Sequence, residues 1–159
     1  MKKQRKEPEA ESVITLRMWT YLGAQKAVPY FRSLVQSLRD GWLAMRQAQE
    51  KQKKLEARPG KPDRDTLIAI EESSREMMRT EAKLEEVIEE MLGLSAYCVD
   101  PRAGLAVIPF MRGPDLAWFV FDLFDEQGIS SWRLYSDPLE TRRPLSELEQ
   151  PVPTPPAIA

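Results

Sequence analysis

Apolar residues recur at alternating spacings of three and four in two long stretches of the chain. The first stretch, from about residue 29 to 57, and the second, from about residue 63 to 92, therefore predict amphipathic helices. Thr20 is expected to cap a shorter preceding helix, which Pro29 is expected to kink or break. The two apolar rows are Val28, Phe31, Val35, Leu38, Trp42 and Met45, and Leu67, Ile70, Met77, Leu84, Ile88 and Met91, with Ser74 and Glu81 interrupting the second row.

A segment rich in proline and glycine, residues 58–63, separates the two long helical patterns. Its two prolines and its glycine end one helix and allow the chain to reverse direction. Asp63 or Asp65 can cap the second helix, and Gly93 is the expected C-terminal cap. We therefore expect an antiparallel helical hairpin over about residues 20–93.

Beyond residue 93 the pattern changes to short runs rich in aromatic and β-branched residues, separated by turns that contain Pro or Gly. These runs predict an antiparallel β-meander over about residues 96–135, with Val13–Trp19 as a candidate extra edge strand. The predicted fold class is therefore α+β: a long antiparallel helical hairpin packed on a small antiparallel β-meander.

The two ends of the chain differ in composition from the part between them. Residues 1–12 are polar and charged and predict a disordered tail, while residues 147–159 are rich in proline and predict an extended one. Residues 13–146 are expected to form a single domain. No apolar run approaches the ~20 residues of a spanning helix, and none follows the basic start, so we expect no membrane contact and a cytoplasmic location.

Charge separates the two predicted helices. Residues 32–64 carry nine basic and four acidic side chains, a net charge of +5, whereas residues 65–90 carry three basic and nine acidic ones, a net charge of −6. Opposite charges favour lateral pairing of the helices, although burial is expected to supply most of the stability. The whole chain of 159 residues has a formal net charge of −2, which does not point to nucleic acid. The basic cluster at the hairpin tip has no interleaved aromatic residues and is interpreted as a solvated surface: Lys51, Lys53, Lys54, Arg58, Lys61 and Arg64.

The composition restricts the chemistry that the chain can perform. There is no histidine, which excludes a histidine base and histidine metal ligands. The single cysteine, Cys98, has no histidine to activate it and is expected to be a buried, inert thiol. Carboxylates at helical spacing, Glu85, Glu86, Glu89 and Glu90, lack the Glu-x-x-His motif of di-iron bundles. We expect a protein that is not an enzyme, with no catalytic residues, no metal and no cofactor.

Asp122 is the acidic residue with the most unusual position, because it stands between Phe121 and Leu123 in a predicted apolar strand. If its side chain faced the core, a cation would have to meet it, and Arg133 or Arg142 could supply one. Asp122, Arg133 and Arg142 are therefore the candidate contacts for an anion or another ligand. Strand alternation predicts instead that Asp122 points outward in a structural role, which is the interpretation we favour.

The run Arg142-Arg143-Pro144 also has two interpretations. Two guanidinium groups can grip a phosphate or a carboxylate by paired hydrogen bonds. They can equally clamp the C-terminal segment onto Asp137, Glu140 or the helices, and we favour this clamp, with Arg142 as the residue that forms it.

Several short motifs occur in a defined order along roughly residues 13–146. They are the helix start Trp19–Pro29, the turn Val99-Asp100, the strand Gly104–Pro109, the strand end Val120-Phe121-Asp122, the loop Asp125-Glu126, the pair Trp132-Arg133 and the stretch Arg142–Leu145. In this order and spacing the chain resembles the bacterial domain-of-unknown-function family 2203. That family has a strand, two long helices and a set of short strands, and it has no established activity. The resemblance therefore implies a fold and little function.

The chain departs from the family pattern mainly at polar positions. Family Lys, Asp and His residues are replaced by Val99, Val107 and Arg133, and a Cys-Trp pair by Phe121-Asp122. If those polar groups form a site in the family, most of it is missing here. The positions that keep the family residue are Thr20, Pro29, Asp100, Gly104, Trp132, Arg142 and Pro144.

These patterns favour a non-catalytic interaction or scaffold protein that self-associates through its helical hairpin. A small sheet leaves part of such a hairpin uncovered, so we expect a homodimer, with another protein as a further class of partner. The alternative is a small-molecule or anion-binding module, such as a degenerate relative of an enzyme, that uses Asp122, Arg133 and Arg142. A pocket lined by all three residues would favour binding, and an apolar stripe on the hairpin would favour assembly. The apolar residues off the two main rows are Leu43, Leu55, Ile68 and Val87.

Overall fold

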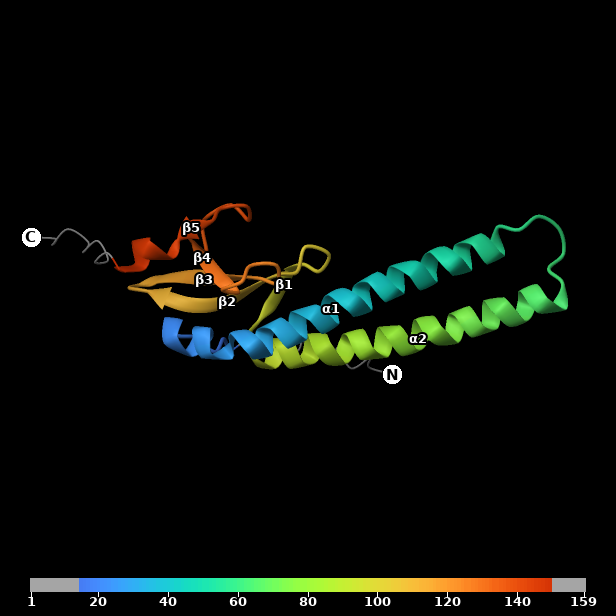
Figure 1. Ribbon diagram of the computed structural model, residues 1–159, viewed down its shortest axis with the longest axis horizontal. Helices are drawn as coiled ribbons and strands as arrows, with labels where there is room; N and C mark the ends of the chain where they lie inside the picture. Colours follow the sequence, from blue (N-terminus) through green and yellow to red (C-terminus); the bar gives the residue numbers. More distant parts are fainter. Residues whose placement is uncertain (1–14, 150–159) are drawn as a thin grey trace, which may run out of the picture.

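The computed structural model describes residues 15–149 and confirms the predicted α+β fold, a helical hairpin packed on a five-stranded antiparallel sheet (Figure 1). The helices run antiparallel and lie side by side over most of their length, while the first turns of α1 extend past the end of α2. The sheet has the simple strand order β1-β2-β3-β4-β5. The elements are α1 (Tyr21–Glu56), α2 (Arg64–Gly93), β1 (Tyr97–Asp100), β2 (Leu105–Arg112), β3 (Asp115–Asp122), β4 (Ile129–Leu134), β5 (Arg143–Pro144) and a 3-10 turn (Leu145–Glu149).

α1 begins at the expected cap but is not interrupted at Pro29. The Thr20 side chain accepts a hydrogen bond from the Gly23 amide at 3.0 Å. The helix of 36 residues continues through Pro29, so of the two expected outcomes, a kink or a break, the break does not occur. A proline removes one backbone hydrogen bond, but Val28 and Phe31 on either side of it are buried against the core. Packing of this face keeps the helix continuous.

α2 begins and ends through local hydrogen bonds of its flanking residues. Asp63 is the N-terminal cap, and its carboxylate accepts a hydrogen bond from the Thr66 amide at 2.8 Å. Hydrogen bonding by the Thr66 side chain, and then by its backbone amide, holds the pKa of Asp63 below its usual range. At the other end, Gly93 is the last helical residue and not the cap that the sequence suggested. The left-handed position is taken by Ser95, with a φ of 56°.

The inward face of α2 is offset from the predicted apolar row. Leu67 and Ile88 of that row are 54% and 39% exposed, while Thr66 and Ser73 are buried. Ile70, Met77, Leu84 and Met91 of the row do face inward, so the row is wrong only at Leu67 and Ile88, where small polar side chains such as Thr66 and Ser73 face α1 instead. The inward positions, which alternate by four and three, are Thr66, Ile70, Ser73, Met77, Thr80, Leu84, Val87 and Met91.

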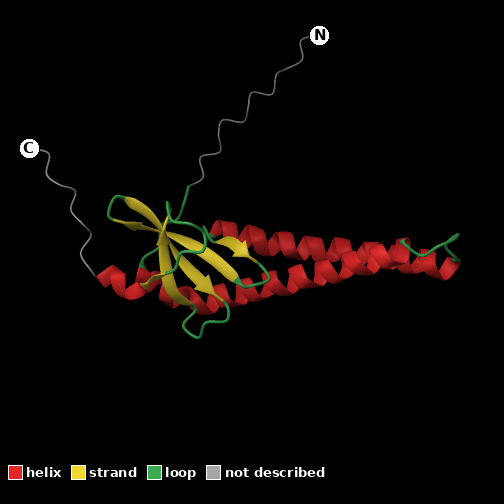
Figure 2. Ribbon diagram, turned by 90° about the horizontal axis from the view of Figure 1, so that it is seen from above, coloured by secondary structure: helices red, strands yellow, loops and turns green. Residues whose placement is uncertain are grey.

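The core lies where one face of the sheet rests on the first half of α1 and the last turns of α2 (Figure 2). Ile108, Phe119 and Trp132 stand in register on three neighbouring strands and are each about 1% exposed. Phe31 of α1 reaches this layer and meets Phe121, with ring centroids 6.2 Å apart. Burial of large aromatic side chains therefore joins the helices to the sheet.

The predicted edge strand Val13–Trp19 does not form in the described part, residues 15–19, and residues 13–14 lie outside the described residues. The segment instead crosses the end of the sheet in an irregular conformation. The Trp19 amide donates to the Pro109 carbonyl at 2.8 Å, and the Arg17 amide donates to the Ser95 hydroxyl at 2.7 Å. The segment is thus held by single hydrogen bonds to β2 and to the turn at Ser95, without a regular strand ladder.

A fifth strand and a final helical turn lie beyond the predicted meander. β5 pairs with β4 through Ser131 opposite Pro144 and Trp132 opposite Arg143. Leu148 in the following turn packs on the core, so the folded part extends past the expected boundary at residue 146. The expected N-terminal tail, residues 1–12, lies outside the described residues. The expected C-terminal tail, residues 147–159, lies outside them from residue 150 onward.

Gly128 permits the close contact between the β3–β4 connection and α1. Its φ is +74°, and a Cβ there would lie 2.6 Å from Val28 Cγ1. Gly128→Ala should lower the free energy of unfolding by about 2–4 kcal/mol, because it combines backbone strain with overpacking. Gly93→Ala is the matched control: nothing lies within 4 Å of its Cβ position, and the change should be neutral or stabilising by up to ~1 kcal/mol. Urea unfolding measures the free energy of unfolding of both variants. Equal stability of the two variants would contradict the role of Gly128 in the close contact with α1.

Candidate functional site

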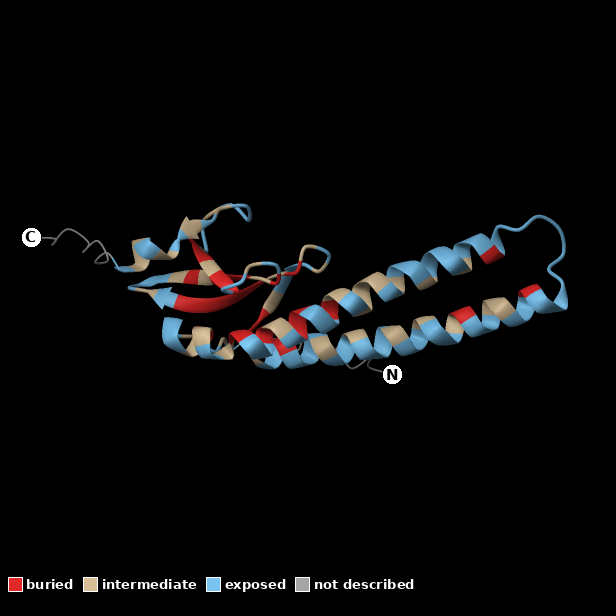
Figure 3. Ribbon diagram, in the orientation of Figure 1, coloured by how far each residue is buried: buried red, intermediate tan, exposed pale blue. Residues whose placement is uncertain are grey.

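The hairpin extends far beyond the sheet, and its distal part (residues 46–80, the hairpin arm) is covered by no other element of the described chain (Figure 3). Among the apolar residues of the arm only Leu55 is buried. The other residues that face the partner helix are half-buried or polar. Two helices alone leave most of each helical surface open to solvent, so the arm has no packing layer within the described chain.

The contact between the two helices of the arm contains polar groups that are only partly hydrogen-bonded. Gln52 Nε2 donates to Ser74 Oγ at 3.3 Å and to Glu56 Oε1 at 3.2 Å. Within residues 15–149, the buried Gln52 Oε1 and Ser73 Oγ have no hydrogen-bond partner. A buried polar group without a partner lowers stability by about 1–3 kcal/mol. The contact between the helices of the arm is therefore weak for its length.

The opposite charges of the two helices do not pair with each other as expected. No ion pair within 4.0 Å joins α1 to α2 in the described residues, and Arg75 pairs instead with Glu71 on its own helix. The Tyr30 hydroxyl does donate to Glu90 near the sheet, and this bond raises the pKa of Tyr30. The exposed lysines of α1 and glutamates of α2 remain available to another molecule.

The arm carries exposed apolar residues on α2. Leu67, Ile68 and Met78 are 54%, 43% and 70% exposed. Of the residues expected to lie off the main rows, Ile68 is exposed, but Leu55 and Val87 pack inward. Leu55 and Val87 therefore belong to the intramolecular contact. The exposed apolar surface consists of separate residues among glutamates, not of a continuous stripe.

Asp122 and Arg142 are brought together at the end of β3. Asp122 points away from the core, as strand alternation predicted, while Phe121 and Leu123 are buried. Arg142 Nη1 lies 3.5 Å from Asp122 Oδ2, and the Arg142 side chain is 45% exposed. Asp122 also accepts the Phe124 amide at 3.0 Å. The pair is a solvent-exposed contact at a turn, and pairs of this kind contribute about 0–1 kcal/mol.

Arg133 lies apart from the other two candidate residues. It stands on β4 opposite Trp118 of β3 and is 6% exposed. It lines a groove with Trp118 and Asp137, and neither Asp122 nor Arg142 belongs to that groove. The predicted constellation of three residues is therefore not a single site.

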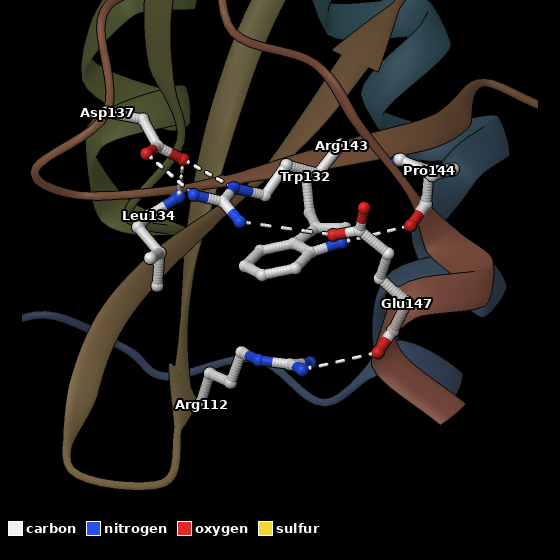
Figure 4. A network of polar contacts seen from close by, with 7 residues as sticks. All are labelled: Arg112, Trp132, Leu134, Asp137, Arg143, Pro144 and Glu147. Carbon is white, nitrogen blue, oxygen red and sulfur yellow. Dashed lines mark hydrogen bonds and ion pairs between the residues drawn. The ribbon is translucent and has the colours of Figure 1, made fainter. Parts of the chain in front are cut away.

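The C-terminal segment is held by Arg143, not by the predicted Arg142. Arg143 Nε and Nη2 donate to the two oxygens of Asp137 at 2.8 and 2.9 Å (Figure 4). The Leu134 amide donates to the same carboxylate at 2.8 Å. These hydrogen bonds lower the pKa of Asp137 and raise that of Arg143. The sequence indicates a clamp in the run Arg142-Arg143-Pro144, but only the pairing of β4 with β5 selects Arg143.

Trp132 is the centre of this cluster, with one arginine on each side of its ring (Figure 4). The guanidinium carbons of Arg112 and Arg143 lie 4.7 and 5.3 Å from the ring centroid. The indole Nε1 donates to the Pro144 carbonyl at 3.1 Å, and Arg112 donates to the Glu147 carbonyl at 3.2 Å. Cation–π contacts and hydrogen bonds thus fix β5 and the last turn to the sheet. The sequence pattern does not predict this cluster.

The remaining candidates offer no nucleophile or metal site. Cys98 is exposed and not buried as expected, yet partial desolvation and the neighbouring Asp100 raise the pKa of its thiol. In residues 15–149 no three Asp, Glu or Cys side chains lie close enough to hold a metal ion. Within the same residues, neither helix is apolar enough over a sufficient length to span a membrane.

Comparisons of the chain with models of protein families, with curated proteins and with solved structures find no match. The resemblance to family 2203 therefore stays a prediction.

Arg143→Ala should destabilise the protein more than Arg142→Ala. The Arg143–Asp137 pair is bidentate and part-buried, so its loss should lower the free energy of unfolding by about 1–2 kcal/mol after allowance for solvent screening. Arg142→Ala should change it by less than about 0.5–1 kcal/mol. Matched urea melts measure both, and a larger loss from Arg142→Ala would restore the original assignment of the clamp.

The contribution of Asp137 should depend on pH. Its pKa is lowered in the folded state by the hydrogen bonds from Arg143 and Leu134. The stability from this shift is complete above the unfolded pKa, about 3.9, and is lost as pH falls through the folded pKa. The difference in unfolding free energy between wild type and Asp137→Asn should therefore shrink from about pH 6 to about pH 2. A difference that stays constant over this range in urea melts would contradict the role of the carboxylate.

Proposed function

We propose that the protein is a non-catalytic interaction or scaffold protein that forms a homodimer through its hairpin arm. The observation that carries the proposal is the arm itself, a pair of helices with no covering layer and with opposite charges that do not pair internally. Oligomers most often use two-fold symmetry, in which each copy contributes the same surface. In such a dimer, the arm of each copy covers the exposed helix surface of the other arm.

A two-fold arrangement lays α1 of one copy along α2 of the other. The net charge of +5 over residues 32–64 then faces the net charge of −6 over residues 65–90. The exposed Lys51 and Lys54 of one arm meet the acidic side of the other. Because the arm has no continuous apolar stripe, charge sets the orientation and the partner, and burial of the separate residues Leu67 and Met78 adds to the affinity.

The absence of catalytic chemistry is part of the same proposal. The sequence contains no histidine, and the pKa of its single thiol is raised. We also propose that the protein is located in the cytoplasm and that it binds an additional protein partner. The anion-binding alternative, in the form that joins Asp122, Arg133 and Arg142, is not retained, because Arg133 is separate from the other two.

Sedimentation equilibrium should show a dimer at high micromolar concentration, and reversal of the arm charges should break it. In Lys51→Glu/Lys54→Glu both helix contacts of the dimer become repulsive, so this variant should be monomeric. Glu72→Lys/Glu76→Lys should be monomeric for the same reason. An equimolar mixture of the two variants should dimerise again, because every contact of the mixed dimer joins opposite charges.

Two controls make this experiment specific to the arm. Phe124→Asp replaces an apolar residue of the sheet end that is 66% exposed, and it should leave the dimer intact. Met78→Asp, at a position 70% exposed on the arm, should weaken it at least tenfold. Wild-type protein that sediments as a monomer, or variants that stay monomeric when mixed, would contradict the proposal.

A further inference from the structure

A groove of about 620 Å³ lies on the sheet face that points away from the helices. Val107 and Trp118 alternate along β2 and β3 with the core residues Ile108 and Phe119, so they belong to this outer face. Leu16 and Leu116 add further apolar surface to the lining. The volume is within the range of about 300–1,000 Å³ that is typical of small-molecule sites.

The groove contains one buried charge whose hydrogen-bonding capacity is not used. Arg133 lines it and is 6% exposed, although an arginine is always protonated. Within residues 15–149 its guanidinium makes no hydrogen bond and no ion pair within 4.0 Å. The Arg133 nitrogens do not belong to the buried, unpartnered polar atoms of residues 15–149, so they reach solvent and their donors are free to bind an acceptor in the groove.

Asp137 also lines the groove but does not neutralise Arg133. Its two oxygens accept the bidentate pair from Arg143 and the Leu134 amide, at 2.8–2.9 Å (Figure 4). The charge of Asp137 is thus balanced by Arg143, which is itself not a lining residue. The charge of Arg133 also lowers the pKa of Asp137, but Arg133 makes no ion pair with it within 4.0 Å, so the hydrogen-bond donors of Arg133 stay free.

We propose that this groove binds a small amphipathic carboxylate. The carboxylate oxygens accept paired hydrogen bonds from the Arg133 guanidinium, a geometry that the planar side chain favours. The aliphatic or aromatic body of the ligand lies against Trp118, Val107 and Leu116. The site uses Arg133 without Asp122 or Arg142. It is also separate from the hairpin arm, so this proposal does not depend on the proposed homodimer.

Decanoate is a suitable probe, with decanol and decyltrimethylammonium as matched neutral and cationic probes. Calorimetric titration of the full chain should show saturable binding of one decanoate per chain and at least tenfold weaker binding of the other two. Arg133→Met keeps the length of the side chain without its charge and should weaken decanoate binding at least tenfold. Arg142→Gln, the matched change of an exposed arginine, should leave the affinity unchanged.

Methyl and indole NMR signals locate the probe in the wild-type protein, which keeps the test valid if Arg133→Met does not fold. Decanoate should shift the signals of Trp118, Val107 and Leu116, and Arg133→Lys should bind it more weakly than wild type. Equal binding of decanol and decanoate, or shifts confined to other residues, would overturn the proposal. Decanoate binding that appears only after deletion of residues 1–14 would also overturn it, in favour of the chain's own N-terminal segment as the occupant.

Discussion

A sheet of short strands cannot cover a hairpin made of helices of 36 and 30 residues, and the rest of the structure follows from this mismatch. The longer helix spans about 54 Å, whereas strands of eight residues span about 26 Å. One end of the hairpin therefore shares an aromatic core with the sheet, and the other end projects as an arm. The molecule has a rigid end and a projecting end, and each carries a different candidate surface.

The two candidate surfaces differ in how firmly the fold holds them. The outer groove lies on strands whose opposite face is the core, and the Arg143–Asp137 pair and the stacked Trp132 fix its neighbouring segment. Arg133 is therefore presented by a rigid surface. The arm, in contrast, has an internal contact that contains Gln52, Ser73 and Thr66, with few buried apolar side chains. A second copy would stabilise the arm, while a ligand would change the groove little.

In two places, a shift of one residue along the chain decides which side chain makes a contact and which does not. Arg142 and Arg143 are adjacent in the chain, yet only the pairing of Trp132 with Arg143 selects which one holds Asp137. On α2, a shift of one position distinguishes Ser73, which is buried, from Ser74 on the predicted row. In both cases neighbouring residues have similar chemistry, so composition and periodicity do not distinguish them. Contacts with a distant part of the chain distinguish the two residues of each pair.

The sequence by itself determined the α+β fold, the helical hairpin and the first four strands, because local periodicity and turn residues specify these elements. The cap at Thr20 and the outward direction of Asp122 follow from equally local rules. Only the tertiary structure decided that helix α1 continues through Pro29, that Arg133 is buried in a groove, and that Arg143 forms the clamp. These outcomes depend on packing between segments far apart in the chain, and packing energy exceeds the local preferences that a sequence pattern records.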